Sequence, residues 1–305
     1  MPAISQAFRC FDEVARRGSV RKAALSLHLT AAAVNQQILN LEASVGVPLF
    51  DRLPRGMQLT TAGEIVVAAV RRCQRDFDNA LSQVEDLRAL RRGHVAIGVP
   101  HATAEVLLPG VLESVQASHP GISFAVRTGT GESLLRLLER GEVDAAYCLR
   151  RPTSVGLEEV RSWPQRLGVV TAPGHPLMAR QRPMRLRDCL DHPLVLLCPD
   201  MELRTVLDTL GTPLLRNGRA AIETNSVPMA RRLIAGGQAV GFLLPDNVAD
   251  DVTTGRLVWR ALQDPGARLH SAVYQRTGCA TPVALALFLQ AMEVAMAKLH
   301  ASFEI

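Results

Sequence analysis

The pattern of apolar and polar residues over the first sixty positions predicts three short helices. Apolar residues recur at helical spacing over 4–15, 20–27 and 31–45. Ser19 and Thr30 are suitable N-caps for the second and third helices, and a glycine follows the first and the third. A supporting helix followed by two short helices with a tight turn between them is the helix-turn-helix plan. The third helix is expected to bury Val34, Ile38, Leu41 and Val45.

The start of the third helix carries residues that suit the reading of DNA bases. In a helix-turn-helix, the N-terminal part of this helix faces the major groove. Asparagine and glutamine can pair bidentately with adenine, and alanine methyl groups can contact thymine methyl groups. The exposed candidates are Ala31, Ala32, Asn35, Gln36 and Gln37. An ordinary amphipathic helix with a polar face would show the same pattern.

Residues 47–60 predict a strand, a turn and a returning strand, which together form a wing. Pro54 and Gly56 mark the turn. Arg52 and Arg55 lie beside it, where they could reach phosphates or enter a narrow minor groove.

A long helix is predicted over 61–92, because Thr61 and Glu64 form a capping box at its start. Apolar residues then recur in alternating steps of four and three, which is a heptad seam. A strict heptad favours pairing with a second copy of the chain, whereas a helix docked on its own domain would fit a looser period of 3.6. The seam consists of Val66, Val70, Cys73, Phe77, Ala80, Val84 and Leu87.

From His94 onward, strands alternate with helices. This alternation predicts an α/β fold with a largely parallel sheet, and the length of this part suits two small lobes. The predicted strands are 94–99, 122–127, 143–149, 168–171, 194–198, 220–224, 240–244 and 257–260. The predicted helices are 107–115, 134–138, 201–210, 226–235 and 282–301.

Four blocks of the N-terminal part closely resemble the winged helix-turn-helix of LysR-type transcriptional regulators. They are Gly18–Ala24, Leu41–Glu42, Gly46–Arg52 and Leu59–Glu64, in the order and spacing of that family. One departure is the run Ala31–Ala33, where the family usually has polar residues that often contact bases. The resemblance therefore carries over the position of the reading helix more than its sequence preference.

The resemblance extends more loosely over the rest of the chain, on Leu108–Pro109, Gly141–Ala146, Pro173–Leu177 and Gly236–Pro245. These segments look like the effector domain of the family, which is similar to two-lobed periplasmic solute-binding proteins. The implied domains are a winged helix-turn-helix over 1–60, a linker and dimerisation helix over 61–92, and an effector-binding domain over 93–305, with lobe I at 93–162 and 268–305 and lobe II at 163–267.

The resemblance implies a bacterial, cytoplasmic regulator whose binding or bending of promoter DNA is controlled by a small-molecule effector between the two lobes. Its linker helix would pair two subunits, and its effector lobes would join dimers into a homotetramer. RNA polymerase is a further candidate partner. The residues expected to contact DNA are Ser19, Arg21, Lys22, Thr30, Ala31, Ala32, Asn35, Gln36, Gln37, Arg52 and Arg55.

Ligands of two-lobed α/β proteins bind between the lobes, at strand ends and helix N-termini. Hydroxyls and backbone N–H groups in the predicted loops favour a small anionic metabolite. Asp200 and Glu202 favour an amine or a zwitterion instead. Turn and capping chemistry alone would explain any single one of these residues. The effector-binding candidates are His101, Ala102, Thr103, Thr128, Gly129, Thr130, Pro199, Met201, Glu202, Asn225 and Ser226.

The positive charge of the chain lies mostly in its first third. Residues 1–92 hold 13 Lys/Arg against 9 Asp/Glu, a net of +4 out of the +5 of the whole chain. None of the seven basic residues in 1–60 lies within 31–44, so they flank the reading helix. This placement predicts that positive charge holds phosphates while neutral side chains read bases.

Several classes of protein do not fit the sequence. It has no GxSxG, HExxH or GxxxxGK[ST] motif, so we expect no enzyme, no cofactor and no metal. The six cysteines form no CxxC pair, which predicts buried free thiols in a reducing compartment. We also expect no secretory signal and no membrane span. A secreted solute-binding protein would share the C-terminal fold but would lack the winged N-terminus.

Overall fold

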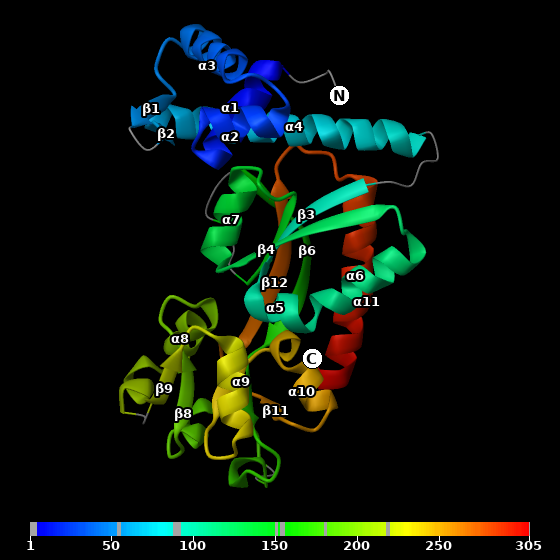
Figure 1. Cartoon of the computed structure of the whole chain (residues 1–305). Helices are drawn as coiled ribbons and strands as arrows, with labels where there is room; N and C mark the ends of the chain where they lie inside the picture. The colour runs from blue at the N-terminus through cyan, green and yellow to red at the C-terminus, as the bar shows by residue number, and fades with distance from the viewer. Residues whose placement is uncertain are drawn as a thin grey trace. The chain divides into compact units, whose positions relative to one another are not determined.

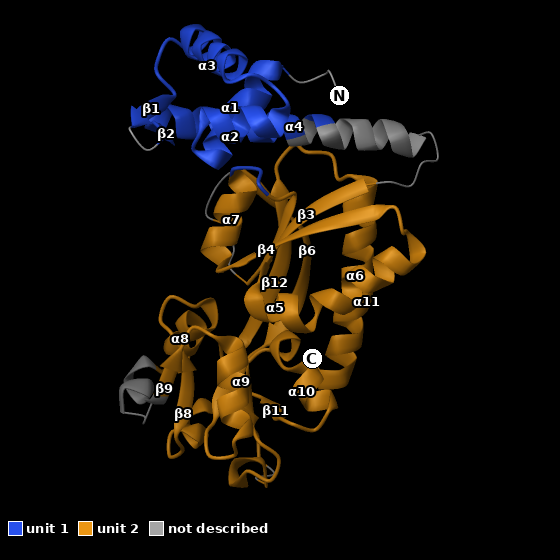
Figure 2. Cartoon of the chain, viewed as in Figure 1, with its two compact units in different colours: residues 1–84, 140–142 blue, residues 85–139, 143–305 orange. Residues whose placement is uncertain are grey.

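The computed structural model describes residues 5–53, 56–87, 93–149, 152, 156–179, 182–217 and 220–304, with side chains outside 75–76, 78–87, 212–217 and 220–221. The chain divides into two compact units, which Figure 2 shows in different colours. The first contains residues 1–84 and 140–142, and the second contains 85–139 and 143–305.

The first unit has the three helices and the wing that the sequence predicts. Its hairpin is antiparallel and pairs Phe50 with Leu59. The side chains of Ser19 and Thr30 accept the N–H groups of Lys22 and Ala33, which confirms both predicted N-caps. The elements are α1 (Gln6–Arg17), α2 (Val20–Leu27), α3 (Ala31–Val45), β1 (Phe50–Leu53) and β2 (Gly56–Leu59).

One apolar core holds these elements together. Phe11 is fully buried and packs edge-on against Phe50, with ring centroids 5.2 Å apart. Helix α3 contributes three of its four expected core residues. The fourth expectation is wrong, since Val45 is 42% exposed in the last turn of the helix, next to the left-handed Gly46.

Two backbone contacts fix the wing on the helices. The N–H of Met57 donates to the carbonyl of Gly18 at 2.9 Å, and a methyl group at position 56 would overlap that carbonyl. Gly56 also has a φ of 139°, which side chains of L residues rarely allow. On the other strand, the carboxylate of Glu42 accepts the N–H groups of Leu49 and Phe50 at 2.7 and 3.2 Å.

The long helix α4 spans Thr61–Leu87. Its cap is Thr60, whose Oγ1 accepts the N–H of Gly63 at 3.0 Å, so the predicted capping residue Thr61 is one position too late. Val70 is 2% exposed and lies in the core of the first unit, with Val66 packed against that core. The first two positions of the predicted seam therefore pack within the chain itself, Val70 buried and Val66 partly buried. The other seam residues are Cys73, which is exposed, Phe77, which is half-buried, and Ala80, Val84 and Leu87, whose side chains lie outside the described residues.

The second unit begins with lobe I, a five-stranded sheet of order β4-β3-β5-β12-β6. Strand β3 is parallel to β4 and β5, but β12 is antiparallel to β5 and β6. The expectation of a largely parallel sheet is therefore wrong. The strands are β3 (Gly93–Pro100), β4 (Ile122–Gly129), β5 (Ala145–Cys148), β6 (Leu157–Arg166) and β12 (Arg268–Arg276).

Helices cover both faces of the lobe I sheet (Figure 1). Alternate residues of β5 point to opposite faces, so Tyr147 packs toward α6 and α11 while Ala146 packs toward α7. Helix α11 is long and apolar enough to cross a membrane by composition, but it contributes seven residues to the core and is a core helix here. The helices are α5 (His101–Val106), α6 (Leu108–Ser118), α7 (Gly131–Glu139) and α11 (Val283–Phe303).

Lobe II forms a second core around two small sheets. Strand β7 lies between β10 and β11 and is antiparallel to both, while β8 and β9 are parallel. The strands are β7 (Gly168–Thr171), β8 (Leu194–Leu197), β9 (Ala220–Thr224), β10 (Gly241–Leu243) and β11 (Val258–Ala261). The helices are η1 (Pro176–Ala179), η2 (Leu186–Cys189), α8 (Glu202–Asn217), α9 (Val227–Ala235), η3 (Pro245–Asn247) and α10 (Ala249–Thr253).

The chain passes between the lobes twice, at adjacent points. It leaves β6 at Arg166 and enters β7 at Gly168, and it returns through Ala267 into β12 at Arg268. The N–H of Leu167 donates to the carbonyl of Ala267 at 2.9 Å, which joins the two passages. The sequence placed these passages near 162 and 268.

All six cysteines are free thiols, but only half of them are buried. Cys10, Cys148 and Cys189 are buried, whereas Cys198 is half-buried. The expectation of buried thiols is wrong for Cys73, which is exposed on α4. Cys279 is half-buried.

Candidate functional site

The N-terminal turns of α3 present a neutral surface. Ala31, Ala32 and Gln36 are exposed, while Asn35 and Gln37 are half-buried. The Nε2 of Gln36 donates to Oδ1 of Asn40 at 2.9 Å, so the helix itself holds this amide in place. The surface therefore offers methyl groups and oriented amides, with no charged side chain among them.

Ser19 and Thr30 lie at the N-termini of α2 and α3, where each hydroxyl accepts a backbone N–H. Their first role is to cap the helices. Helix N-termini attract phosphate groups, because backbone N–H groups there have no partner within the helix. Both residues are thus placed beside a possible phosphate contact by the same geometry that makes them caps.

Some positive residues of the first unit form ion pairs within it. Arg16 and Arg17 both pair with Glu13, and the hydrogen bond from Arg17 holds the pKa of Glu13 below its ordinary value. These two arginines are engaged within the unit.

A second group of positive residues flanks α2 and the wing. Arg21, Lys22 and Arg52 are exposed and form no ion pair with any residue that the structure describes. Arg55, the other expected wing contact, lies outside the described residues. Three of the predicted contact residues thus have a positive charge that is available to an anionic partner.

The second unit contains a cavity of about 380 Å³ between its lobes. Nine predicted residues line it, and Thr128 and Pro199 do not. The nine are His101, Ala102, Thr103, Gly129, Thr130, Met201, Glu202, Asn225 and Ser226. Residues 101–103, expected in a loop, form the first turn of α5 instead.

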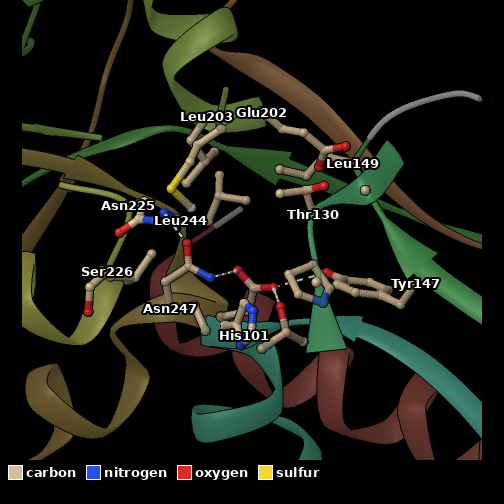
Figure 3. A pocket seen from close by; sticks show the side chains of 18 of the residues that line it. His101, Thr130, Tyr147, Leu149, Glu202, Leu203, Asn225, Ser226, Leu244 and Asn247 are labelled. Carbon is tan, nitrogen blue, oxygen red and sulfur yellow. Dashed lines mark hydrogen bonds between the residues drawn. The ribbon is translucent and has the colours of Figure 1, made fainter. Parts of the chain in front are cut away.

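A buried carboxylate lies at the wall of this cavity. Asp246 of η3 is 1% exposed. Its Oδ2 accepts the hydroxyls of Thr103 and Tyr147 at 3.1 and 3.0 Å, and its Oδ1 accepts Nδ2 of Asn247 at 3.2 Å. Figure 3 draws these bonds as dashed lines, in the space between the labelled side chains of Asn247 and Tyr147. Burial raises the pKa of Asp246 to about 6, against which the hydrogen bonds act.

The network continues into the strands that connect the lobes. Nε2 of Gln165 on β6 lies 3.4 Å from the hydroxyl of Tyr147 and 3.2 Å from Oγ of Ser271 on β12. Burial, and secondarily the charge of Asp246, raises the pKa of Tyr147 well above its ordinary value, so the phenol keeps its proton. Hydrogen bonds thus connect Asp246, through Tyr147 and Gln165, to both strands that lead into the other lobe.

Glu202 brings a second carboxylate across the cavity. It is the first residue of α8, and a methyl group at Gly131, the first residue of α7, would overlap its carboxylate. Figure 3 shows Glu202 near Thr130. The positive end of α7, where the sequence predicted a ligand carboxylate, thus faces a carboxylate of the chain itself.

A buried arginine also links the lobes through an ion pair with a half-exposed carboxylate. Arg231 of α9 is 8% exposed and pairs with Asp251 of α10 and, at 3.3 Å, with Glu105 of α5. Burial raises the pKa of Asp251, but hydrogen bonds from Arg231 and Arg256 outweigh it and hold this pKa below its ordinary value. Helix α5 is therefore tied to lobe II through Thr103 and through Glu105.

Comparison with known proteins identifies both units. The bacterial regulatory helix-turn-helix family of LysR type matches residues 5–64, and the LysR substrate binding domain matches residues 88–297. The chain belongs to the LysR family of transcriptional regulators. Members of this family are DNA-binding regulators with an effector-binding domain rather than enzymes.

LysR-type relatives cover most of the chain. The regulator YybE of Bacillus subtilis (strain 168) is 27% identical over 83% of this chain and 87% of its own length. The activator CmpR of Synechocystis sp. is 25% identical over 77% of each chain. The regulator CbbR of Rhodospirillum rubrum is 27% identical over 81% of this chain and 82% of its own.

Solved structures of LysR-type regulators share the fold. A full-length OxyR variant from Pseudomonas aeruginosa has a TM-score of 0.67 at 19% identity, covering 96% of this chain and 93% of its own. Full-length CbnR complexed with its target DNA has a TM-score of 0.64 at 18% identity, covering 95% and 99%. At these identities, the likeness shows the fold alone.

The sequence missed the two residues at the centre of the hydrogen-bond network in the cavity wall, Tyr147 and Asp246. Tyr147 reads as part of an apolar strand, and Asp246 follows Leu244 and Pro245, where a carboxylate reads as a turn residue. The available signal was position, since Tyr147 is near the carboxyl end of β5 and Asp246 follows β10. The remaining lining residues that were not among the predicted set are Pro100, Gly131, Leu149, Asp200, Leu203, Val227, Pro228, Leu244 and Asn247.

Proposed function

We propose that this LysR-type regulator reads promoter DNA with the N-terminal turns of α3 and grips phosphates with the residues that flank it. The observation that carries this proposal is the neutral, exposed start of α3 beside Arg21, Lys22 and Arg52, which form no ion pair with the described residues. Phosphate contacts fix the position of the protein on DNA, whereas base contacts determine its specificity. Asn35, Gln36 and Gln37 supply the base contacts, and Ala31 and Ala32 contact thymine methyl groups.

Two subunits pair through the later part of the α4 seam. Val66 and Val70 contribute to the core of the first unit, so pairing falls to Cys73, Phe77 and the seam residues that follow. A dimer presents two reading helices to a two-fold symmetric site. The effector lobes join dimers into a tetramer in the cytoplasm, where RNA polymerase is a further partner at the promoter.

A small molecule in the cavity controls the response of DNA. The lobes are tied by the bonds of Asp246 and by the ion pair of Arg231, both of which lie in one compact unit with the cavity. A ligand that binds one lobe arrangement better shifts the population toward it. That shift changes the spacing of the reading helices and hence DNA bending.

The test of DNA binding is a gel-shift titration on the intergenic DNA upstream of the gene for this chain. We expect R21A/K22A to weaken binding on all sequences and to lower the salt slope by about 2, because two phosphate contacts are lost. Arg232→Ala is the control, since Arg232 is an exposed arginine in the second unit. Binding that survives deletion of residues 1–60 would contradict the assignment.

A further inference from the structure

The wall of the cavity is acidic. Asp200, Glu202 and Asp246 contribute carboxylates to it, and no lysine or arginine lines it among the residues that the structure describes. Among the described lining residues, only His101 carries a basic ring. An anion entering this space would meet three carboxylates and no fixed cation in the described wall.

The deepest polar groups are arranged to accept hydrogen bonds. The hydroxyls of Thr103 and Tyr147 both donate to the same oxygen of Asp246. Both hydroxyl protons are therefore used within the wall. Gln165 donates to Tyr147 and Asn247 donates to Asp246, so the remaining oxygen lone pairs of the two hydroxyls and the carboxylate are left for a ligand. A buried carboxylate surrounded by neutral donors is stabilised further when a cation reaches it.

One place in the wall that suits an anion, the N-terminus of α7, is already in use. Backbone N–H groups at the N-terminus of α7 form the positive end of that helix, and the carboxylate of Glu202 lies against Gly131 there. A ligand carboxylate would have to displace Glu202. A ligand ammonium has no such competitor, and Glu202 adds to its attraction.

We infer that the cavity binds a small primary amine in its ammonium form, with its N–H groups on Asp246, Thr103 and Tyr147 and an apolar body against Leu149 and Leu244. An ammonium group has three donors and no acceptor, which matches the acceptor set of the wall. This inference rests on the proposed function, because it specifies the chemistry of the effector in the same cavity.

The experiment compares matched probes on the full chain by calorimetric titration near neutral pH. Hexylamine, hexanoate and hexanol share one apolar body and differ in the head group. We expect hexylamine to bind saturably and with at least about tenfold higher affinity than the other two, since a hydrogen-bonded charge pair contributes that much. Equal or tighter binding of hexanoate, or no binding of hexylamine, overturns the inference.

Variants locate the binding. Asp246→Asn is expected to lower hexylamine affinity at least about tenfold, and Glu113→Gln, an exposed carboxylate on α6, is expected to leave it unchanged. If Asp246→Asn fails to fold, D200N/E202Q serves instead and is expected to lower the affinity by a smaller factor. Hexylamine affinity that is unchanged in every folded cavity variant contradicts the site.

Two arginines require their own variant. Arg150 and Arg151 follow Leu149 in the sequence and lie outside the described residues. We expect R150Q/R151Q to retain hexylamine binding, whereas hexanoate binding that is lost in this variant would show an anion site and overturn the inference. Gel shifts on the same preparations distinguish the two proposals. If DNA binding responds to hexanoate but not to hexylamine, the proposed regulatory function stands and the inference of an amine effector is contradicted.

Discussion

The two binding surfaces of this chain are built in opposite ways. The proposed DNA surface is formed by neighbours in sequence, since the proposed contacts that the structure describes lie between Ser19 and Arg52, and their charges are exposed and positive. The cavity joins residues as far apart as Thr103 and Asp246, and its central charge is buried and negative. Local sequence therefore determines the first surface, and tertiary packing determines the second.

This difference has a physical consequence for how each surface responds to its surroundings. Exposed charges are screened within about 8–10 Å at ordinary salt, so binding at the DNA surface depends on ionic strength. The buried Asp246 is shielded from salt, but its pKa of about 6 lies close to physiological pH. Salt should act on the first unit and pH on the second.

The largest effect is expected from a substitution that unfolds one of the two units and leaves the other folded. Phe11→Ala removes a fully buried ring and should destabilise the first unit by about 3–5 kcal/mol and abolish DNA binding. Both tryptophans, Trp163 and Trp259, lie in the second unit, so their fluorescence during urea denaturation reports that unit alone. We expect the tryptophan transition to stay in place while the circular dichroism signal develops an earlier step.

Phe288→Ala is the matched control, because Phe288 is fully buried in the lobe I core. It should lower the urea concentration at which the tryptophan fluorescence changes. The urea concentration at which the first unit unfolds should stay the same as in the unaltered chain. An equal shift of the tryptophan transition in both variants would mean that the two units unfold as one.

A second, smaller effect concerns pH. The pKa of Asp246 is about 6 against an ordinary value of 3.8, so unfolding releases a proton between these values and the free energy of unfolding falls as pH rises through this window. Tyr147→Phe removes one donor to the carboxylate and should cost about 1–3 kcal/mol above the window, and less below it, where the carboxyl is protonated. Thermal melts of both proteins across the window measure this.

Tyr274→Phe controls for the loss of a buried phenol, since Tyr274 is 4% exposed in the other lobe I core. Its effect on the melting temperature should not change through the window. If the effect of Tyr147→Phe does not depend on pH, ionisation of Asp246 does not determine the contribution of the Tyr147 hydrogen bond to stability.

The same contrast explains what could be predicted from the sequence. The caps Ser19 and Thr30 and the terminal glycines act within a few residues, so the three helices and the wing were predicted closely. Even there, the cap of α4 is Thr60, because its hydroxyl also bonds back to the carbonyl of Pro48, a contact outside the local pattern.

In the second unit, the sequence missed the strands β6 and β12, which connect the lobes. β6 is a sheet edge with mostly polar residues and only two buried positions, and the buried run of β12 is flanked by charged and polar residues, so neither shows a long apolar period. Without them, the sheet looked parallel. Residues at the ends of strands were correctly predicted to form much of the cavity wall. The place of Asp246 in that wall could not be predicted, because its partners Thr103 and Tyr147 are distant from it in sequence.

Asn35 is proposed to contact a base. Asn35→Ala should reduce discrimination at one base pair by about 1–3 kcal/mol without changing the salt slope, because an amide contact carries specificity and no charge. Affinity for duplexes that vary one base pair at a time measures this. Gln6→Ala, at an exposed amide on α1, should change neither quantity. A uniform loss across all duplexes would make Asn35 a positional contact instead.

The smallest effect is expected at the wing. Arg52 is exposed and forms no ion pair with the described residues, so Arg52→Ala should leave folding unaffected and remove one phosphate contact. The slope of log affinity against log salt should fall by about 1, with sequence preference unchanged. Arg16→Ala is the matched control, because Arg16 is engaged with Glu13 and should leave the slope unaltered. If Arg52→Ala instead changes preference for A·T-rich duplexes, the wing reads the minor groove and the division between gripping flanks and a reading helix no longer holds.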